Sequence, residues 1–525
     1  MGKVRKKLLI IAGLIISGIN SSWANNITDI NSKSKQITTT NKYLNQSNRK
    51  ILYELNYPKN LSLPTYSREV LVKTYKKIKF EELENILLNN NPSIKIYKTK
   101  IDQAKSLLKN SLSYWYPTLN LSANGIPQYF EGNNYNQSNS IQDTSSKQWS
   151  SSLSAQIKWD LINPARVPEI SAARNGFEKA KYSFSIIMKD LKLEAKKRYF
   201  NLQKSNEEIE VAKKSIESST VGLRDAKIRF ESGIGTKLEI LEAKTQLARD
   251  QQLLNTKIGD QKIGQRALAE ILNLPEDVTP VIGSQTRLIG IWNKSLEDSI
   301  IAAYNMREEL NNNLLDISIS THEANSALAA GKPKLSIVNT FTTTFNKGEL
   351  NKISPNINTK SSSLSNTIGL NASWYIFDGG NSQSLYKFNK SKSEEAKLTF
   401  AKKRAQIRKE VEEVFFKLES AKSNISASYS EVLSSKESLR LTKLRYKSEI
   451  ATQREVVTAQ RDLTDSKVRY IVAVTNYNIL LADLSRQTGL DNIKPCDIKV
   501  NEKNPTNLKD TISLSESNLI PLCQL

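Results

Sequence analysis

Two kinds of hydrophobic spacing follow one another along this chain. From Phe80, apolar residues recur every three or four positions, which predicts one helix that ends near Tyr116, just before Pro117. Beyond Pro117, apolar and polar residues alternate, which predicts β-strands. The same order of patterns returns in the second half, where the last strand is expected to continue through Trp374 and Ile376. We therefore expect two β-hairpins, at residues 118–162 and 334–377, with polar loops at 125–150 and 347–363.

Each hairpin is followed by a long helical pattern. Apolar residues step by three or four through 167–230 and again through 382–446, and return helices are expected at 238–272 and 456–484. At 1.5 Å per residue, a helix of about 60 residues is about 90 Å long. Helices of this length with narrow apolar seams indicate coiled-coil packing.

The second half of the chain repeats the first at a distance of about 216 residues. Phe230–Ala243 matches Tyr446–Ala459, with Ser, Ile, Thr and Glu in register. Each copy is therefore expected to be one structural unit that buries its apolar face against its neighbours. The resulting organisation is a leader at 1–24, a flexible polar extension at 25–77, a first repeat at 78–280, a second repeat at 281–490 and a C-terminal tail at 491–525.

The N-terminus has the pattern of a secretory signal peptide. A basic stretch precedes an apolar run of about 12 residues from Leu8 to Ile19, and Ser22-Trp23-Ala24 supplies small residues for cleavage after Ala24. This run is shorter than the roughly 20 residues that a membrane-spanning helix needs. We therefore expect an exported protein that contacts a membrane without transmembrane helices.

The predicted strands are amphipathic, with one apolar and one polar face. Trp159 and Trp374 lie near strand ends, where aromatic residues of membrane β-barrels meet the membrane interface. Four strands are too few to close such a barrel, since the smallest have about eight. The pattern therefore favours a transmembrane barrel that several chains share, with the apolar face toward outer-membrane lipid.

Charge and cysteine content change this picture little. The formal net charge of +23 raises nucleic acid or an anionic membrane surface as a partner. Export argues against nucleic acid, and the charges are interleaved in sign, as on a solvated helix surface. Cys496 and Cys523 could form one disulfide in an oxidising compartment or remain as two thiols.

The sequence offers little support for enzymatic chemistry. The single histidine, His322, stands in His-Glu-Ala-Asn-Ser, which lacks the second histidine of a zinc helix motif. The chain has no glycine-rich phosphate loop and no cysteine pair at metal spacing. We expect no enzymatic activity, no cofactor and no metal site.

Several motifs in a fixed order resemble those of the TolC family of outer-membrane efflux proteins. They are Asn91-Pro-Ser-Ile94 before a helix that ends at Tyr116-Pro-Thr-Leu119, Trp374-Tyr-Ile-Phe-Asp-Gly-Gly380 at a strand-to-helix junction, and Arg229-Phe-Glu-Ser-Gly-Ile-Gly-Thr236 followed by Leu241-Glu-Ala243. The resemblance covers about residues 80–490.

The resemblance implies a mainly α-helical fold with a transmembrane β-barrel portion. In a homotrimer of this kind, each chain gives four strands to a 12-stranded barrel and its long coiled-coil helices to an α-helical tunnel in the periplasm. The implied function is that of an outer-membrane exit duct for efflux or type I secretion. The implied partners are a periplasmic adaptor and an inner-membrane pump of the RND, ABC or MFS class.

The resemblance also implies where the tunnel narrows. In the family, acidic residues in an Asp-Val-Leu-Asp-Ala pattern line the periplasmic mouth after the helix–helix turn of the second repeat. This chain has Glu455 and Thr458 at those positions, with Arg454 as a candidate ion-pair partner of Glu455. The first repeat has Glu239 and Glu242 instead.

The turns between the long helices and their return helices are expected to form the periplasmic tip. They lie farthest along the chain from the hairpins, so they are the candidate contacts for the adaptor. Their residues are Gly233, Ile234, Gly235 and Thr236 in the first repeat and Glu449, Ile450, Ala451 and Thr452 in the second.

Two other kinds of protein compete with this interpretation. A periplasmic coiled-coil scaffold without a pore explains the helices and the duplication but not the two pairs of alternating strands. A basic nucleic-acid binder would have to stay in the cytoplasm, and an uncleaved Met1–Ala24 segment in the purified protein would favour it.

Overall fold

The computed structural model describes residues 71, 74–134, 144–284, 286–349, 359–491 and 493–494. The chain divides into two compact units, Met1–Val72 and Lys73–Leu525, and every helix and strand below belongs to the second. The predicted leader, most of the predicted extension, Cys496 and Cys523 lie outside the described residues. No helix among the described residues is long and apolar enough to span a membrane.

The second unit is mainly helical, as expected. Its helices are α4 (Phe80–Asn90), α5 (Pro92–Ser113), α6 (Arg166–Glu231), α7 (Lys237–Ile271), α8 (Leu296–Met306), α9 (Glu308–Ala330), α10 (Asn381–Lys447) and α11 (Gln453–Thr488).

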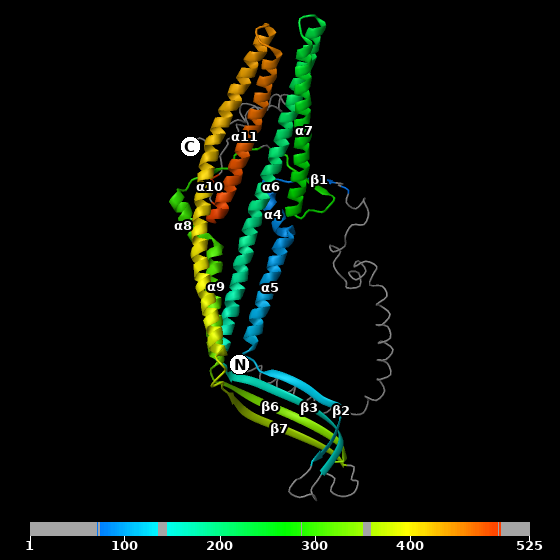
Figure 1. Cartoon of the computed structure of the whole chain (residues 1–525), viewed down its shortest axis with the longest axis vertical. Helices are drawn as coiled ribbons and strands as arrows, with labels where there is room; N and C mark the ends of the chain where they lie inside the picture. The colour runs from blue at the N-terminus through cyan, green and yellow to red at the C-terminus, as the bar shows by residue number, and fades with distance from the viewer. Residues whose placement is uncertain are drawn as a thin grey trace, which may run out of the picture. The chain divides into compact units, whose positions relative to one another are not determined.

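The four predicted long helices are present as α6, α7, α10 and α11. The two longest, α6 and α10, have 66 and 67 residues, so each is about 100 Å long at 1.5 Å per residue. Pro168 lies in the first turn of α6, where its missing N–H removes no hydrogen bond of the helix. Both helices therefore extend without a break from the strands to the turns at the far end (Figure 1).

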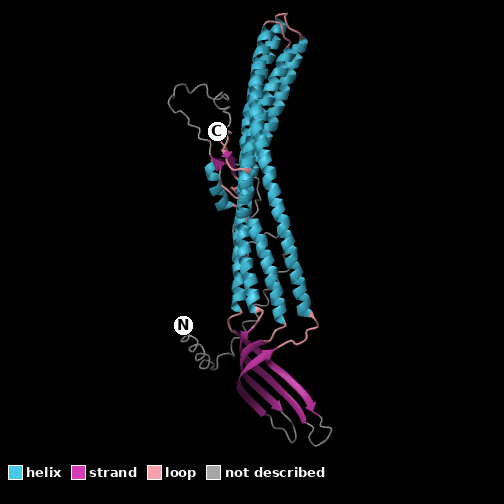
Figure 2. Ribbon diagram, turned by 90° about the vertical axis from the view of Figure 1, so that its left-hand side faces the viewer, coloured by secondary structure: helices cyan, strands magenta, loops and turns pink. Residues whose placement is uncertain are grey.

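The long helices exchange neighbours along their length. Near the strands α6 packs between α5 and α9, and farther away it packs against α7 and α11. Likewise α10 packs first against α9 and then against α11. The result is a wall of adjacent helices, with the α6–α7 and α10–α11 turns at the end opposite the strands (Figure 2).

The prediction of one helix from Phe80 to Tyr116 was wrong, because the helix breaks at Asn91. Asn91 has an extended backbone (φ −62°, ψ 125°), and its side chain accepts a hydrogen bond from the backbone N–H of Ser93 at 2.8 Å. Pro92 occupies the first position of α5, where a missing N–H costs nothing. Apolar spacing alone did not reveal this cap.

The four long strands form one antiparallel sheet in the order β2-β3-β6-β7. Their bounds are β2 (Thr118–Asn134), β3 (Thr144–Ile162), β6 (Lys334–Glu349) and β7 (Thr359–Ser373). Among the described strands, none pairs with the outer edge of β2 or of β7.

The strands extend farther into the predicted hairpin loops than expected, and β7 ends earlier than expected on the side of the helices. Residues expected to be loop are paired, such as Gln128 with Ser150 and Lys347 with Lys360. Backbone pairing satisfies the N–H and C=O groups whatever the side chains are, so the sheet continues beyond the alternating apolar residues. At the other end β7 stops at Ser373, so Trp374 and Ile376 lie beyond the strand.

Two pairs of short strands lie away from this sheet. β1 (Thr74–Lys77) runs parallel to β4 (Val278–Val281), and β5 (Ile291–Trp292) pairs with β8 (Ile493–Lys494). The end of the predicted flexible extension and the start of the predicted tail are therefore ordered strands. They pack beside two apolar clusters, one centred on Tyr199 and Leu202 and the other on α10 and α11.

Candidate functional site

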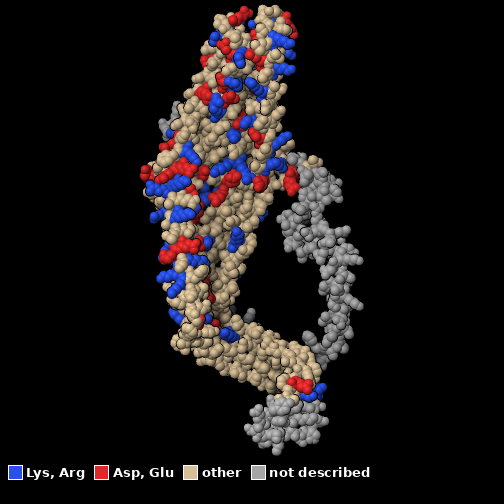
Figure 3. Space-filling view, viewed as in Figure 1, with Lys and Arg blue, Asp and Glu red and all other residues tan. Residues whose placement is uncertain are grey.

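One face of the four-stranded sheet is apolar and exposed. Register pairs Leu121 with Ala155, Ala155 with Phe341, and Leu153 with Ala123, so these side chains share a face. Figure 3 shows charged side chains spread over the helices but almost absent from the sheet except at its far end. The exposed apolar residues of this face are Leu119, Leu121, Leu153, Ile157, Phe341, Phe345, Leu364, Ile368 and Leu370.

The opposite face of the sheet is polar and hydrogen-bonded across the strands. The hydroxyls of Ser122 and Ser154 are 2.7 Å apart, and Nε2 of Gln156 donates to Oγ1 of Thr340 at 3.2 Å. A sheet with these two faces is suited to separate lipid on one side from water on the other.

Trp159 and Trp374 join the sheet to the helices. The indole N–H of Trp159 donates to the carbonyl of Trp115 at 3.0 Å, just after α5. The indole N–H of Trp374 donates to the carbonyl of Gly331 at 3.0 Å, just after α9. The guanidinium of Arg166 lies 4.4 Å from the ring centre of Trp115. Both predicted interface aromatics therefore also hold the boundary between the sheet and the helices.

The sequence interpretation missed a second aromatic group at the far end of the sheet. Tyr129 lies opposite Trp149, with ring centroids 5.1 Å apart. Both residues fall in the segment that was expected to be loop. The pairing of strands beyond the apolar alternation, which single-strand periodicity does not predict, brings them together.

The first helix–helix turn is closed by glycine and threonine. Gly233 has a left-handed backbone (φ 78°), which glycine adopts without a steric penalty. Thr236 caps α7 by accepting a hydrogen bond from the N–H of Glu239 at 3.3 Å.

The second turn repeats this backbone with different side chains. Glu449 takes the left-handed conformation (φ 61°) at the position that Gly233 holds in the first turn. Thr452 and Glu455 form a capping box: the N–H of Glu455 donates to Oγ1 of Thr452, and the N–H of Thr452 donates to Oε1 of Glu455 at 3.0 Å.

The Glu455 carboxylate is therefore held in place before any partner arrives. Its pKa is lowered, first by the hydrogen bond from the backbone N–H of Thr452 and further by Arg445, whose Nη1 lies 3.5 Å from Oε2 of Glu455. The expected ion pair with Arg454 is absent from the described residues. Arg454 lies next to Glu455 on α11, whereas Arg445 reaches it across the turn from α10.

Contacts between the two turns link the repeats. Nη2 of Arg229 lies 3.9 Å from Oε1 of Glu449, and the hydroxyl of Tyr446 donates to Oε2 of Glu239 at 3.3 Å. Burial raises the pKa of Tyr446, and the Glu239 charge raises it further. Of the predicted mouth residues, Glu239 thus contacts the other repeat. Thr458 is exposed one turn after Glu455, and Glu242 is half-buried one turn after Glu239.

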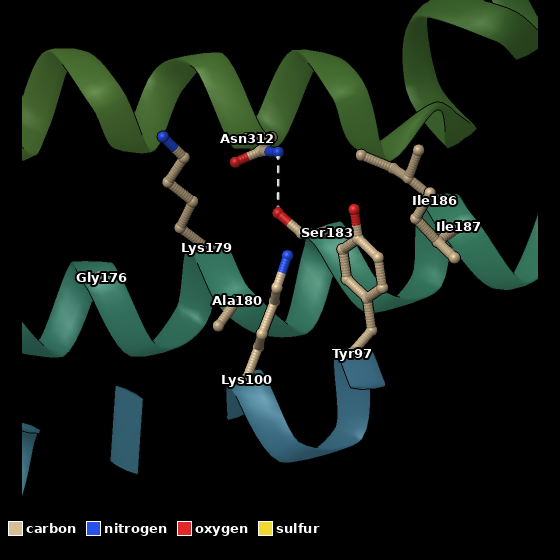
Figure 4. A pocket seen from close by; sticks show the side chains of 9 residues that line it. All are labelled: Tyr97, Lys100, Gly176, Lys179, Ala180, Ser183, Ile186, Ile187 and Asn312. Carbon is tan, nitrogen blue, oxygen red and sulfur yellow. Dashed lines mark hydrogen bonds between the residues drawn. The ribbon is translucent and has the colours of Figure 1, made fainter. Parts of the chain in front are cut away.

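A niche of about 450 Å³, lined by both polar and apolar side chains, lies in the helix wall nearer to the sheet (Figure 4). The amide of Asn312 on α9 donates to the hydroxyl of Ser183 on α6 at 3.2 Å, as the dashed line shows. Lys179 is ion-paired with Asp316. The ammonium of Lys100 on α5 lies 4.3 Å from the ring centre of Tyr97. The seam between these helices therefore combines hydrogen bonds and ion pairs with apolar side chains such as Ile186 and Ile187.

A buried ionic network lies where α9 begins. Arg307 and Arg486 have side chains only 5% and 7% exposed, and both donate to Oε1 of Glu309, at 2.9 and 2.7 Å. Arg307 also contacts Glu410 on α10 at 2.6 Å, and Arg486 contacts Asp190 on α6 at 2.7 Å. Burial alone raises the pKa of Glu309, but the two arginines outweigh it and lower the pKa to about 2.

The network ties α6 of the first repeat to α9, α10 and α11 of the second. Among the described residues, no group of histidine, cysteine and acidic side chains could hold a metal ion.

Comparison with known proteins agrees with this architecture. The sequence profile of the family described as outer membrane efflux protein matches residues 83–274 and 307–490. No curated protein sequence gives a match.

Several solved structures share the fold. A membrane protein from Pseudomonas aeruginosa superimposes with a TM-score of 0.67 at 18% identity, covering 78% of this chain and 92% of that chain. The outer membrane protein VceC from Vibrio cholerae gives a TM-score of 0.65 at 14% identity, with 78% and 95% covered. The CmeC outer membrane channel from Campylobacter jejuni gives 0.64 at 17% identity, with 82% and 94% covered.

Proposed function

Since the chain belongs to the outer membrane efflux protein family, we propose that it forms a trimeric exit duct through the outer membrane. The members of this family are outer-membrane channels rather than enzymes. The duct works with a periplasmic adaptor and an energised inner-membrane pump of the RND, ABC or MFS class, in efflux or in type I secretion.

The sheet carries this proposal. It has an exposed apolar face, a hydrogen-bonded polar face and two outer edges that no described strand covers. An isolated open sheet of this kind would expose both its backbone edges and its apolar face to water. If β7 of one copy pairs with β2 of the next, three copies close a barrel of 12 strands, and every edge is satisfied. The apolar face then meets lipid, and the polar face lines the pore.

The helix wall continues the duct away from the membrane. Because α6 and α10 run from the sheet to the turns, the walls of three copies can form one tunnel with its mouth at those turns. Threefold symmetry repeats Glu455 at one level of this mouth as a ring of carboxylates. A charged ring in a narrow pore selects among passing ions.

The two helix–helix turns are the proposed contact with the adaptor. Ile234 and Ile450 are exposed large apolar side chains at the tips of the two turns. Photocrosslinking residues placed at Ile234 or Ala451 should capture a coiled-coil adaptor in cells. Capture only from positions near Ser150 or Ser361, at the far end of the sheet, would show that the orientation is inverted.

The assembly is tested by extraction of the outer-membrane fraction with detergent. The duct predicts a trimer that runs compactly on a gel and is converted to the monomer by heating. A monomeric or dimeric protein that is released without detergent would instead support a periplasmic scaffold without a pore.

A further inference from the structure

A row of side chains crosses the sheet near its far end, on the apolar face. Register places Tyr129 opposite Trp149, Trp149 opposite Lys347 and Lys347 opposite Lys360, so the row runs across all four strands. Along each strand, alternation puts Lys347 on the face of Phe345 and Phe341, and Lys360 on the face of Leu364. Two lysines therefore lie where the apolar part of this face gives way to charged residues.

The two lysines lie directly opposite one another in the register of β6 and β7. Like charges in such a pair repel each other and destabilise the sheet unless a counter-charge is present. Among the acidic side chains that the structure describes, none forms an ion pair with Lys347 or Lys360. The neighbouring Glu131 is engaged by Lys147, with 2.6 Å between nitrogen and oxygen. The row thus presents two ammonium groups that no described carboxylate pairs with.

The two lysines also line a hollow in the surface. A cavity of about 420 Å³ is lined by Trp149, Phe345, Lys347 and Lys360, together with neighbouring serines and Asn346. Its aromatic part fits the start of an acyl chain or a sugar face, and its ammonium groups fit an anion.

The distance along β3 places this hollow at the outer membrane interface. Trp159 and Trp149 are ten residues apart on one continuous strand, which is about 33 Å at roughly 3.3 Å per residue. With a strand tilt of about 40°, this corresponds to about 25 Å along the membrane normal, the height of the apolar band of an outer-membrane barrel. If Trp159 lies at the periplasmic interface, Trp149 and the two lysines lie at the headgroups of the outer leaflet.

We propose that Trp149, Lys347 and Lys360 bind the phosphorylated headgroup of a glycolipid in the outer leaflet. The inference rests on the proposed function, because that function orients the hairpin loops outward. In the bound state the phosphate lies between the two ammonium groups and relieves their repulsion, while Trp149 and Phe345 contact the apolar part of the lipid.

In the test, detergent-purified trimers of the wild type and of variants are incubated with bis-phosphorylated lipid A. Native mass spectrometry then measures how much lipid each trimer retains. Lys347→Gln combined with Lys360→Gln should weaken retention about tenfold to thirtyfold, since each lysine near a membrane surface contributes roughly fivefold. A matched control removes Lys158 and Lys334, which lie on the polar face of the same sheet, and should retain lipid like the wild type. Arginine at both positions 347 and 360 should preserve retention.

The same measurement with other lipids and with a free anion identifies the ligand. Dephosphorylated lipid A and phosphatidylethanolamine should be retained as weakly by the wild type as by the double glutamine variant. Inorganic pyrophosphate should not displace the phosphorylated lipid at equal concentration. Equal retention by the wild type and the double variant overturns the site, and displacement by pyrophosphate shows a site for free anions instead. If the same trimers conduct ions in a bilayer, such a failure leaves the proposed channel intact.

Discussion

The two repeats break their helices at equivalent points by different chemistry. Asn91 and Arg307 lie about 216 residues apart, each at the extended residue that separates two helices. Asn91 caps α5 and donates from Nδ2 to the carbonyl of Ile271 at 2.7 Å. Arg307 makes no cap and instead holds Glu309, Glu410 and Gln487 through its guanidinium.

The difference shows how one backbone is adapted to two surroundings. The side-chain hydrogen bonds of Asn91 among the described residues stay within the first repeat, where a short neutral amide satisfies the helix ends. The second lies where α6 of the first repeat meets three helices of the second, and there a branched ionic network spans the junction. The first repeat should therefore tolerate substitution at its break better than the second.

The largest expected effect is at Arg307. Arg307→Met removes one of the two arginines that hold the largely buried Glu309, and breaking a buried ion pair typically costs about 3–5 kcal/mol of unfolding free energy. The measurement is denaturation of the detergent-solubilised protein, followed by circular dichroism. Arg440→Met is the control, because Arg440 pairs with Glu437 at 2.7 Å on the exposed surface, where solvent screens the pair and it adds little to stability. Equal effects of the two substitutions would contradict the role of the network.

The second prediction is that variants at the two helix breaks differ from the wild type in how their thermal stability depends on pH. The folded-state pKa of Glu309, about 2, lies below its ordinary value of 4.5, so its ionised form stabilises the fold. This stabilisation is fully present above the unfolded-state pKa and is lost as the pH falls from about 4.5 through about 2. The thermal midpoints of the wild type and Glu309→Gln should therefore converge between about pH 6 and about pH 2.5. Asn91 does not titrate, so the gap between the wild type and Asn91→Ala should stay constant, and a constant gap for Glu309→Gln would refute the prediction.

A smaller effect is expected at Asn91. Asn91→Ala removes both the cap and the bond to the carbonyl of Ile271, which together should cost about 1–2 kcal/mol. Asn91→Asp keeps the acceptor for the N–H of Ser93 but loses the donor, so its loss should be intermediate. Denaturation curves of the two variants distinguish these contributions. A loss as large as that of Arg307→Met would mean that the two breaks are equally important.

The smallest effect is expected at the helix–helix turns. There, a substitution in the second repeat should stabilise the protein, and the matching substitution in the first repeat should destabilise it. Glu449 holds a left-handed backbone that costs a non-glycine residue about 1–2 kcal/mol, whereas Gly233 holds it freely. Glu449→Gly should therefore raise the free energy of unfolding by up to about 1 kcal/mol, offset partly by the loss of its contact with Arg229. Gly233→Ala should lower it by about the same amount. If both substitutions lower it, the Glu449 side chain contributes more than its backbone strain costs.

Much of the fold could be predicted from the sequence because it depends on local periodicity. The long helices and the first strand of each hairpin follow from spacing that is visible within a few turns or pairs. The outer part of the sheet could not be predicted in this way, because residues such as Gln128 and Lys360 are in strands only through their partners.

The candidate site was predictable in position but not in its contacts. The repeat located both turns, yet the partner of Glu455 is Arg445 across the turn rather than the adjacent Arg454. The network around Arg307 joins residues more than 100 positions apart, such as Glu410, which no local pattern connects. The roles of the turns and of Glu455 in the assembled duct stay predictions.

The central claim, a conducting trimer, is tested most directly in a planar lipid bilayer. Purified trimer should insert and give stable, uniform conductance steps. Glu455→Gln should lower the permeability of cations relative to anions without dissociating the trimer, because glutamine at this position also completes the capping box with Thr452. A folded trimer that inserts into the bilayer and conducts no current would contradict the account.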